Sequence, residues 1–185
     1  VAPHRAADLK AFRQIDAWIF DLDNTLYPRS SNLFRQVDDR IRAYVSRLLN
    51  VDEAEAERIQ KGFYREHGTT LRGLMLTHNV NVDEFLAFVH DIDHSVVRPN
   101  PALGAAILRL PGKKYIFTNG SRAHAEKVAA RLGFPTHFED IFDIVAANLV
   151  PKPEQQTYDR FLQHFTIEPA RAAFLDWINR FPTAH

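Results

Sequence analysis

The sequence lacks several features that would point to particular classes of protein. None of its 185 residues is cysteine, which excludes disulfide bonds and thiolate chemistry. Its 23 basic and 23 acidic residues balance, so its net charge favours neither a nucleic acid polymer nor an anionic membrane as a partner. No stretch approaches the ~18 consecutive apolar residues of a membrane span, and residues 1–16 hold no apolar run typical of a signal peptide. We therefore expect a cytoplasmic globular protein.

Hydrophobic patterns divide the chain into three stretches. The apolar run Ala17–Phe20 ends abruptly in polar residues, as a buried strand does where it meets a turn. Apolar side chains then recur at spacings of three and four through much of residues 32–94, which predicts a block of helices. After the proline-rich stretch 98–101, predicted strands alternate with predicted helices. This alternation is typical of a parallel α/β sheet, with the helical block inserted after its first strand.

The same patterns predict the individual elements. We expect strands at 17–20, 115–117, 141–145 and 172–175. We expect helices at 33–49, 53–67, 71–78, 82–93, 102–110, 121–132 and 154–165. Asp52 is the expected N-cap of the second helix, and Gly68 ends that helix. The predicted domains are an α/β core of residues 1–29 and 98–185 and a helical insertion of residues 30–97.

Two acidic residues, Asp21 and Asp23, directly follow the first predicted strand. Neighbouring acids raise each other's proton affinity or recruit a cation, and a carboxylate can attack phosphorus to form an aspartyl-phosphate. A strand-ending turn with two solvated acids has the same pattern, so the pair alone leaves both interpretations open. Ligands of parallel α/β sheets bind at the carboxyl ends of the strands, which is where the pair lies.

Three further polar signals lie at predicted strand ends or on loops before helices. Thr118, Asn119 and Gly120 offer a hydroxyl and backbone N–H groups to an anion, although plain helix capping also explains this pattern. Lys152 lies between two prolines, on a loop stiff enough to hold an ammonium against a phosphate, although an isolated lysine is usually just exposed. Asp176 adds a carboxylate, a ligand that Mg²⁺ prefers. The four signals together and in this order are far stronger than any one alone.

These residues resemble the motifs of the haloacid-dehalogenase-like (HAD) hydrolase superfamily. The run FDLDNTLYP at 20–28 resembles motif I, TNG at 118–120 resembles motif II, and KP at 152–153 resembles motif III. Asp176 falls where motif IV is expected. The resemblance covers nearly the whole chain. It implies a Rossmannoid parallel sheet as the core, with the helical insertion as the cap of HAD subfamily I.

A narrower resemblance is to the pyrimidine 5′-nucleotidase branch of this superfamily. It is carried by LYP at 26–28, YREHGTTLRGL at 64–74 and VPKPE at 150–154. No simple packing requirement calls for GTTLRG inside a helical block, although a turn followed by an N-cap accounts for part of it. The resemblance implies a pyrimidine nucleoside 5′-monophosphate as the substrate. We expect Tyr64, His67 and Thr70 to contact it from the cap.

The family resemblance also implies a mechanism. Asp21 would be the covalent nucleophile and Asp23 the general acid and base. The phosphoryl oxygens would be bound by Thr118, Asn119, Gly120 and Lys152. The cofactor would be Mg²⁺, with the protein ligands Asp21, Asp23 through its main-chain carbonyl, and Asp176. The only expected partner is a small-molecule phosphate ester.

The motif IV region departs from the family pattern. The nucleotidase branch shows two adjacent acids here, whereas Asp176 stands between Leu175 and Trp177. Asp176 matches either acid, and the position of Asn179 does not decide the register. The family fold continues through a further helix and strand, so we expect that the C-terminal part of the core is missing. An ion held by fewer carboxylates should bind more weakly.

Three alternative functions stay open at this point. The substrate of the same chemistry could be a sugar phosphate or pyridoxal phosphate. A haloacid dehalogenase is disfavoured by Asp23, because carbon–halogen cleavage needs no acid to protonate a leaving oxygen. The abnormal motif IV is also compatible with a catalytically impaired binding protein. The sequence leaves the oligomeric state open.

Overall fold

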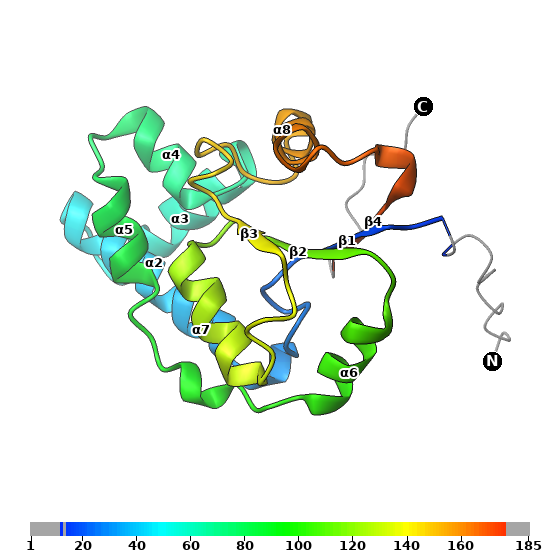
Figure 1. The fold of residues 1–185 in the computed structure, drawn as a ribbon. Coiled ribbons are helices and arrows are strands. Elements are labelled where there is room, and N and C mark those ends of the chain that lie inside the picture. The colour runs from blue at the N-terminus through cyan, green and yellow to red at the C-terminus, as the bar shows by residue number, and fades with distance from the viewer. Residues whose placement is uncertain (1–11, 13, 177–185) are drawn as a thin grey trace, which may run out of the picture.

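Four parallel strands form a single sheet between helices in the computed structural model, which describes residue 12 and residues 14–176 (Figure 1). The strands are β1 (Ala17–Phe20), β2 (Lys113–Phe117), β3 (Asp140–Phe142) and β4 (Ala172–Leu175). Their order across the sheet is β3-β2-β1-β4, and each neighbouring pair is parallel. The predicted α/β class with a parallel sheet is therefore confirmed.

Alternate residues of the central strands supply two hydrophobic clusters, one on each face of the sheet. Trp18 and Phe20 pack on one face with the buried side of α7 (Arg122–Leu132) and with Ile107 of α6 (Pro101–Arg109). Ile19 packs on the other face with α8 (Gln155–Phe165). Figure 1 shows α8 on one side of the sheet and α6 and α7 on the other. The result is a three-layer core whose strand residues alternate in direction.

The helical insertion has a hydrophobic cluster of its own. Its helices are α2 (Leu33–Leu49), α3 (Glu53–His67), α4 (Thr70–Thr77) and α5 (Val82–Val89). They bury a shared set of apolar side chains, to which Ile144 and Leu149 are added from the sheet side. Figure 1 shows these four helices grouped beyond the β3 edge of the sheet. The predicted boundaries of core and insertion, at residues 29/30 and 97/98, stay a prediction.

Local signals explain most helix ends. The Asp52 side chain accepts a hydrogen bond from the Glu55 N–H, as the predicted N-cap of α3. Gly68 then ends that helix with a φ of 80°, a left-handed conformation that a side chain disfavours. Thr69 caps α4 by accepting from the Arg72 N–H. The turn between the two helices is therefore specified by two consecutive residues, Gly68 and Thr69.

Two predicted elements are longer than the observed ones. The predicted helix 82–93 ends at Val89, after which the chain turns toward the core. The predicted strand 141–145 ends at Phe142, because the next residue, Asp143, turns the chain. The Asp143 carboxylate accepts from the N–H groups of Arg122 and Ala146. An acid that satisfies backbone donors of two segments favours a turn over a longer strand.

Two sequence expectations fall on residues outside this description. Trp177 and Asn179, on which the register of motif IV depended, are not among the described residues, and neither is any segment that would complete the core. Within residues 12 and 14–176, no helix is both long and apolar enough to cross a membrane.

Candidate active site

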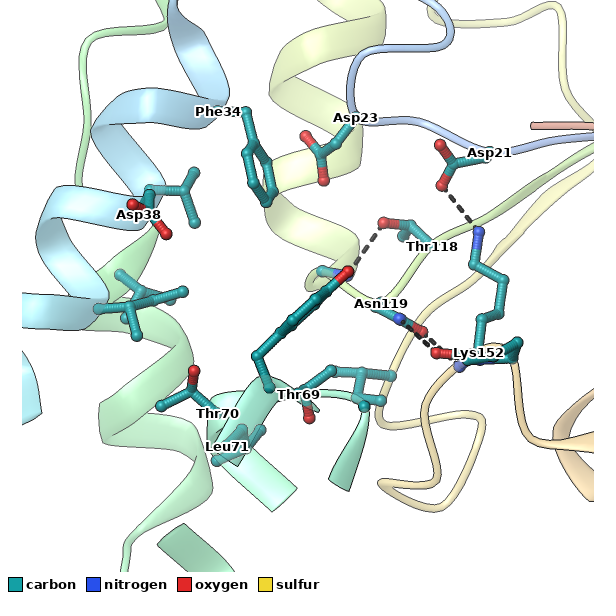
Figure 2. Close-up of a pocket in the computed structure, with 18 of the residues that line it drawn as sticks. Asp21, Asp23, Phe34, Asp38, Thr69, Thr70, Leu71, Thr118, Asn119 and Lys152 are labelled. Atoms are coloured by element: carbon teal, nitrogen blue, oxygen red, sulfur yellow. Dashed lines mark hydrogen bonds and ion pairs between the residues drawn. The ribbon is translucent and has the colours of Figure 1, made fainter. Parts of the chain in front are cut away.

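The register of the sheet brings the ends of three strands together. Phe20 of β1 pairs with Ile116 of β2 and with Leu175 of β4. Asp21 therefore lies beside Asp176 at the end of β4, and Thr118 follows β2 at the same edge. The Asp21 N–H continues the ladder by donating to the Leu175 carbonyl at 2.9 Å. Four predicted site residues thus converge at the carboxyl edge once Lys152 is added from the loop before α8. Figure 2 shows three of them, Asp21, Thr118 and Lys152.

Lys152 is the buried cation of this edge. Its Nζ donates to Asp21 Oδ1 at 2.7 Å and to the Phe117 carbonyl at 2.8 Å, and lies 3.5 Å from Asp176 Oδ2. The side chain is only 8% exposed. One ammonium is therefore shared between two carboxylates, which keeps two like charges close together.

The loop that carries Lys152 is fixed by Asn119. Asn119 Oδ1 accepts from the Lys152 N–H at 2.8 Å, and its Nδ2 donates to the Lys152 carbonyl at 3.2 Å (Figure 2). The Asn119 side chain thus pairs with the main chain of the loop through two hydrogen bonds, as a neighbouring strand would. This role differs from simple helix capping, because the cap of α7 is Ser121. Asn119 joins motif II to motif III.

Asp21 is held at both carboxylate oxygens. Its Oδ1 accepts from Lys152, and its Oδ2 accepts from the Thr25 hydroxyl at 2.8 Å. Burial raises the pKa of Asp21, and the charge of Asp176 adds to this, while Lys152 opposes it. Two hydrogen bonds therefore orient a desolvated carboxylate at the mouth of the strand, as a nucleophile requires.

Asp23 has a different set of partners. Its Oδ1 accepts from the Tyr27 hydroxyl at 2.5 Å and from His124 Nε2 at 3.0 Å. Burial alone would raise the pKa of Asp23, but the charge and hydrogen bond of His124, together with Tyr27, outweigh it and lower that pKa. Both bonds go to Oδ1, so Oδ2 has no hydrogen bond within the described residues and is the atom able to exchange a proton with a ligand.

A chain of histidines continues outward from Asp23. His94 Nδ1 faces the carbonyl of Ile92, so this nitrogen carries a proton and His94 Nε2 is an acceptor. His124 Nδ1, 3.0 Å from His94 Nε2, is then a donor, and so is His124 Nε2 toward Asp23. Burial and His124 lower the pKa of His94. The hydrogen-bonded chain therefore runs from the Ile92 carbonyl through His94 and His124 to Asp23.

His90 stacks on His124, with ring centroids 4.5 Å apart. Burial lowers the pKa of His90 to about 3, and the charge of His124 adds to the effect. His90 is therefore neutral at physiological pH and covers the His124 ring without adding a charge. No sequence motif predicted this group, because its members come from two separate stretches of the chain, residues 90–94 and residue 124.

A cavity of about 730 Å³ lies between the strand ends and the helical insertion. From the predicted site, its wall includes Asp21, Asp23, Tyr64, Thr70, Thr118, Asn119, Gly120, Lys152 and Asp176. His67 is not among the lining residues. Its ring faces Phe63 on the same helix, and its Nε2 lies 3.8 Å from Glu66. His67 therefore lies beside the cavity rather than in its wall.

Two of the lining residues have structural bonds already. The Thr118 hydroxyl accepts from the Gly120 N–H at 2.9 Å, which leaves its own proton available to an anion. The Thr70 hydroxyl donates to the Gln60 carbonyl at 3.2 Å, which ties α4 to α3. Thr118 thus lines the cavity with a hydroxyl proton still available, whereas Thr70 contributes to the cavity wall with its hydroxyl engaged elsewhere.

The donor set fits a hard divalent cation. Asp21 and Asp176 present carboxylate oxygens from adjacent strand ends, beside the main chain of Asp23. Within the described part of the chain, no cluster of three or more acidic or histidine side chains forms a metal site by itself. Mg²⁺ is commonly bound through one or two carboxylates together with waters and the phosphate of a substrate, so Asp21 and Asp176 are the carboxylates that would hold it.

Comparisons with known proteins agree with this arrangement. A family model described as haloacid dehalogenase-like hydrolase matches residues 15–176. Phosphate metabolism protein 8 of Saccharomyces cerevisiae is 28% identical over 153 residues, which are 76% of this chain and 46% of that protein. The chain thus spans about half the length of this relative.

Solved structures share the fold. A HAD phosphatase from Thermococcus onnurineus superposes with a TM-score of 0.52 at 18% identity, covering 86% of this chain and 76% of that one. YfnB of Bacillus subtilis, a HAD hydrolase solved with magnesium bound, gives a TM-score of 0.51 at 15% identity, covering 86% and 77%. The family match over most of the chain and the converging motif residues lead to one conclusion: this chain belongs to the haloacid dehalogenase-like hydrolases.

Proposed function

We propose that this hydrolase is a magnesium-dependent phosphomonoesterase that acts on a pyrimidine nucleoside 5′-monophosphate through an aspartyl-phosphate. The observation that carries the phosphatase assignment is the second carboxylate beside the nucleophile. Asp23 is oriented by two hydrogen bonds to one oxygen and keeps its other oxygen available. A phosphate ester needs such a group, because its leaving oxygen must be protonated. Release of a halide needs none.

The side chains divide the chemistry among them. Asp21, oriented by Thr25 and Lys152, would attack phosphorus. The pKa of Asp23 is lowered, so Asp23 would first take up at Oδ2 a proton that the phosphate monoester brings, pass it to the leaving oxygen, and later remove a proton from the hydrolytic water. Bound Mg²⁺, on Asp21, Asp176 and the Asp23 carbonyl, would offset the repulsion between the nucleophile and the phosphate.

Charge that develops on the phosphoryl oxygens would be met by three groups at the carboxyl edge. They are the Thr118 hydroxyl, the Asn119 N–H and the Lys152 ammonium, whereas the Gly120 N–H already donates to Thr118. These donors are held by the hydrogen bonds described above, so they need little rearrangement as the reaction proceeds. The helical insertion would cover the site and limit the access of water.

The pyrimidine assignment rests on the cap. The cavity has the volume of a small-molecule site, and its insertion side carries Tyr64 and Thr70 of the run that resembles the nucleotidase branch. The yeast relative is described as a phosphate metabolism protein, which agrees with phosphate ester chemistry but names no substrate. A cytoplasmic location stays a prediction from the sequence.

A substrate panel tests this proposal. We expect UMP and CMP to be cleaved with a kcat/KM at least about tenfold above that for AMP and GMP, since a purine would leave base-binding groups unpaired. Release of inorganic phosphate with Mg²⁺ present is the measurement, with EDTA as the control that should stop it. A purine preference would refute the nucleotidase assignment. Activity that is unchanged in the presence of EDTA would refute the metal dependence.

The variant Asp23→Asn distinguishes the role of Asp23 from that of Asp21. The asparagine cannot give a proton to the leaving oxygen, so we expect UMP turnover to fall by roughly 10²–10⁴-fold. 4-Nitrophenyl phosphate has a leaving group that needs little protonation, and its hydrolysis should fall much less. The two values of kcat are compared in the variant and in the wild type. Equal losses on both substrates would contradict a proton-transfer role for Asp23.

A further inference from the structure

The side of the cavity opposite the catalytic edge contains a pair of acceptors that the reaction described above does not use. Figure 2 shows Asp38, on α2, across the cavity from Asp21 and Lys152. Gln60 of α3 lines the same cavity and is only 4% exposed. Much of the surrounding insertion wall is apolar, with contributions from Val37, Ile41, Leu71, Phe85, Leu86 and Val89.

Hydrogen bonds fix which end of the Gln60 carboxamide is which. One terminal atom lies 3.2 Å from the Asp38 carbonyl and 2.7 Å from Asp38 Oδ1. Both neighbours are acceptors, so this atom is the nitrogen. The other atom, Oε1, is buried and has no hydrogen-bond partner in the described part of the chain. Such an acceptor is costly to leave unpaired, which points to a donor that the protein itself does not supply.

Asp38 is in a similar position. Its Oδ1 accepts from Gln60, and no hydrogen bond within the described residues reaches its Oδ2. Burial raises the pKa of Asp38, and Asp39 adds to this effect, whereas Arg42 and Lys61 oppose it. Asp38 and Gln60 therefore present acceptor atoms to a ligand, because the amide nitrogen of Gln60 already donates to Asp38.

The surrounding charges narrow the kind of donor. Lys61 and Arg65 line the cavity together with Glu66 and Glu154, so a charged ligand group of either sign would meet like charges. A second phosphate would meet the Asp38 carboxylate. A ligand group with neutral donors avoids both of these repulsions. Two hydroxyls on neighbouring carbons supply two such donors for the two acceptor atoms. Carboxylates bind the hydroxyls of ribose in this way in dinucleotide sites.

We infer that Asp38 and Gln60 bind a vicinal diol on the leaving group, so that the enzyme selects phosphate esters of ribose over those of 2-deoxyribose. The inference rests on the proposed phosphatase activity, but not on the identity of the base. It assigns the helical insertion a polar contact to the sugar, on the far side of the leaving group from the phosphoryl group.

Paired substrates test this inference. We expect the wild-type kcat/KM for UMP to exceed that for 2′-deoxyUMP by at least about tenfold, and that for ribose 5-phosphate to exceed that for 2-deoxyribose 5-phosphate similarly. Asp38→Asn should lower kcat/KM for the ribose substrates by about tenfold or more, mainly through KM. In this variant the ratio of ribose to deoxyribose substrate should approach one. Gln60→Met should shift the ratio in the same direction.

Two controls keep a structural role apart from a binding role. Asp39→Asn removes the neighbouring charge of the same helix, where Asp39 is exposed and paired with Arg42, and should leave the ratio at its wild-type value. 4-Nitrophenyl phosphate has no hydroxyls on its leaving group, so its loss in Asp38→Asn should be several-fold smaller than that of UMP. Equal losses on all substrates would mean that Asp38 only supports the helix, and would overturn the inference.

The remaining outcomes separate this inference from the proposed function. A wild-type enzyme that cleaves ribose and deoxyribose substrates equally overturns the diol site and leaves the phosphatase standing. Ribose preference without any preference among bases supports the diol site and refutes the pyrimidine assignment. Failure to cleave any of the phosphate esters overturns both.

Discussion

Replacing Asp21 by asparagine is expected to abolish turnover while the protein stays folded. The amide keeps the shape of the side chain but cannot form an acyl phosphate, so we expect kcat to fall by more than about 10⁴-fold, as for other nucleophile deletions. Phosphate release from UMP and from 4-nitrophenyl phosphate should both be lost. Loss of both distinguishes this variant from Asp23→Asn, in which the activated ester survives better.

The fold should tolerate this change because of the charges around it. Lys152 is shared by two carboxylates, and burial already disfavours the ionised form of Asp21. Without the Asp21 charge, the ammonium of Lys152 still has Asp176 and the Phe117 carbonyl. Thermal unfolding should therefore stay close to the wild type. A variant that retains most of the wild-type rate would show that Asp21 is not the nucleophile.

Replacing Lys152 by methionine is expected to damage both stability and activity. The change leaves Asp21 and Asp176 buried beside each other without their shared cation. Breaking a buried ion pair from one side costs about 3–5 kcal/mol of unfolding free energy. Loss of one positive group at the phosphoryl site should also lower kcat by roughly 10²–10³-fold. Urea unfolding and phosphate release measure the two effects.

The pH dependence of this loss has a defined sign. Without Lys152, the pKa of Asp21 should rise further above its ordinary value of 3.8, because burial and Asp176 are then unopposed. The folded state would then bind a proton that the unfolded state has released, so this variant should recover stability as the pH falls from 7.5 toward 5. The difference in unfolding free energy between variant and wild type should shrink over that range.

Lys127→Met is the matched control for this experiment. Lys127 lies exposed on α7, and its replacement removes one positive charge without exposing a buried carboxylate. Its stability should stay within about 0.5 kcal/mol of the wild type. A Lys152→Met protein as stable as this control at pH 7.5 would contradict the view that Lys152 neutralises the carboxylates of the site.

Much of the architecture could be predicted because its signals are local. The run Ala17–Phe20, the cap at Asp52 and the helix end at Gly68 each depend on a few neighbouring residues. The predicted end of the strand 141–145 was wrong for a reason that is not local. Asp143 ends β3 because it accepts from the N–H of Arg122, which is 21 residues away in the sequence.

The predicted cap contacts also depend partly on local sequence and partly on tertiary packing. The run 64–74 indicated a specific surface, and Tyr64 and Thr70 do line the cavity, but His67 does not. The side chains of Tyr64, His67 and Thr70, near the end of α3 and the start of α4, point in different directions. Only the packing of α3 against α4 decides which of them reach the cavity. Asp38 and Gln60 carry no motif, and their pairing depends on the contact of α2 with α3.

The sequence by itself determined which chemical groups stand at the strand ends: two acids after β1, a hydroxyl and amide after β2, a lysine before α8 and an acid after β4. Each follows from the change between apolar and polar residues along one short segment. The tertiary structure decided which groups act on one another. Lys152 meets Asp21 across 131 positions of sequence, and His124 meets Asp23 across 101. Such partners are set by strand register and helix packing, which join segments whose separate patterns carry no record of the contact.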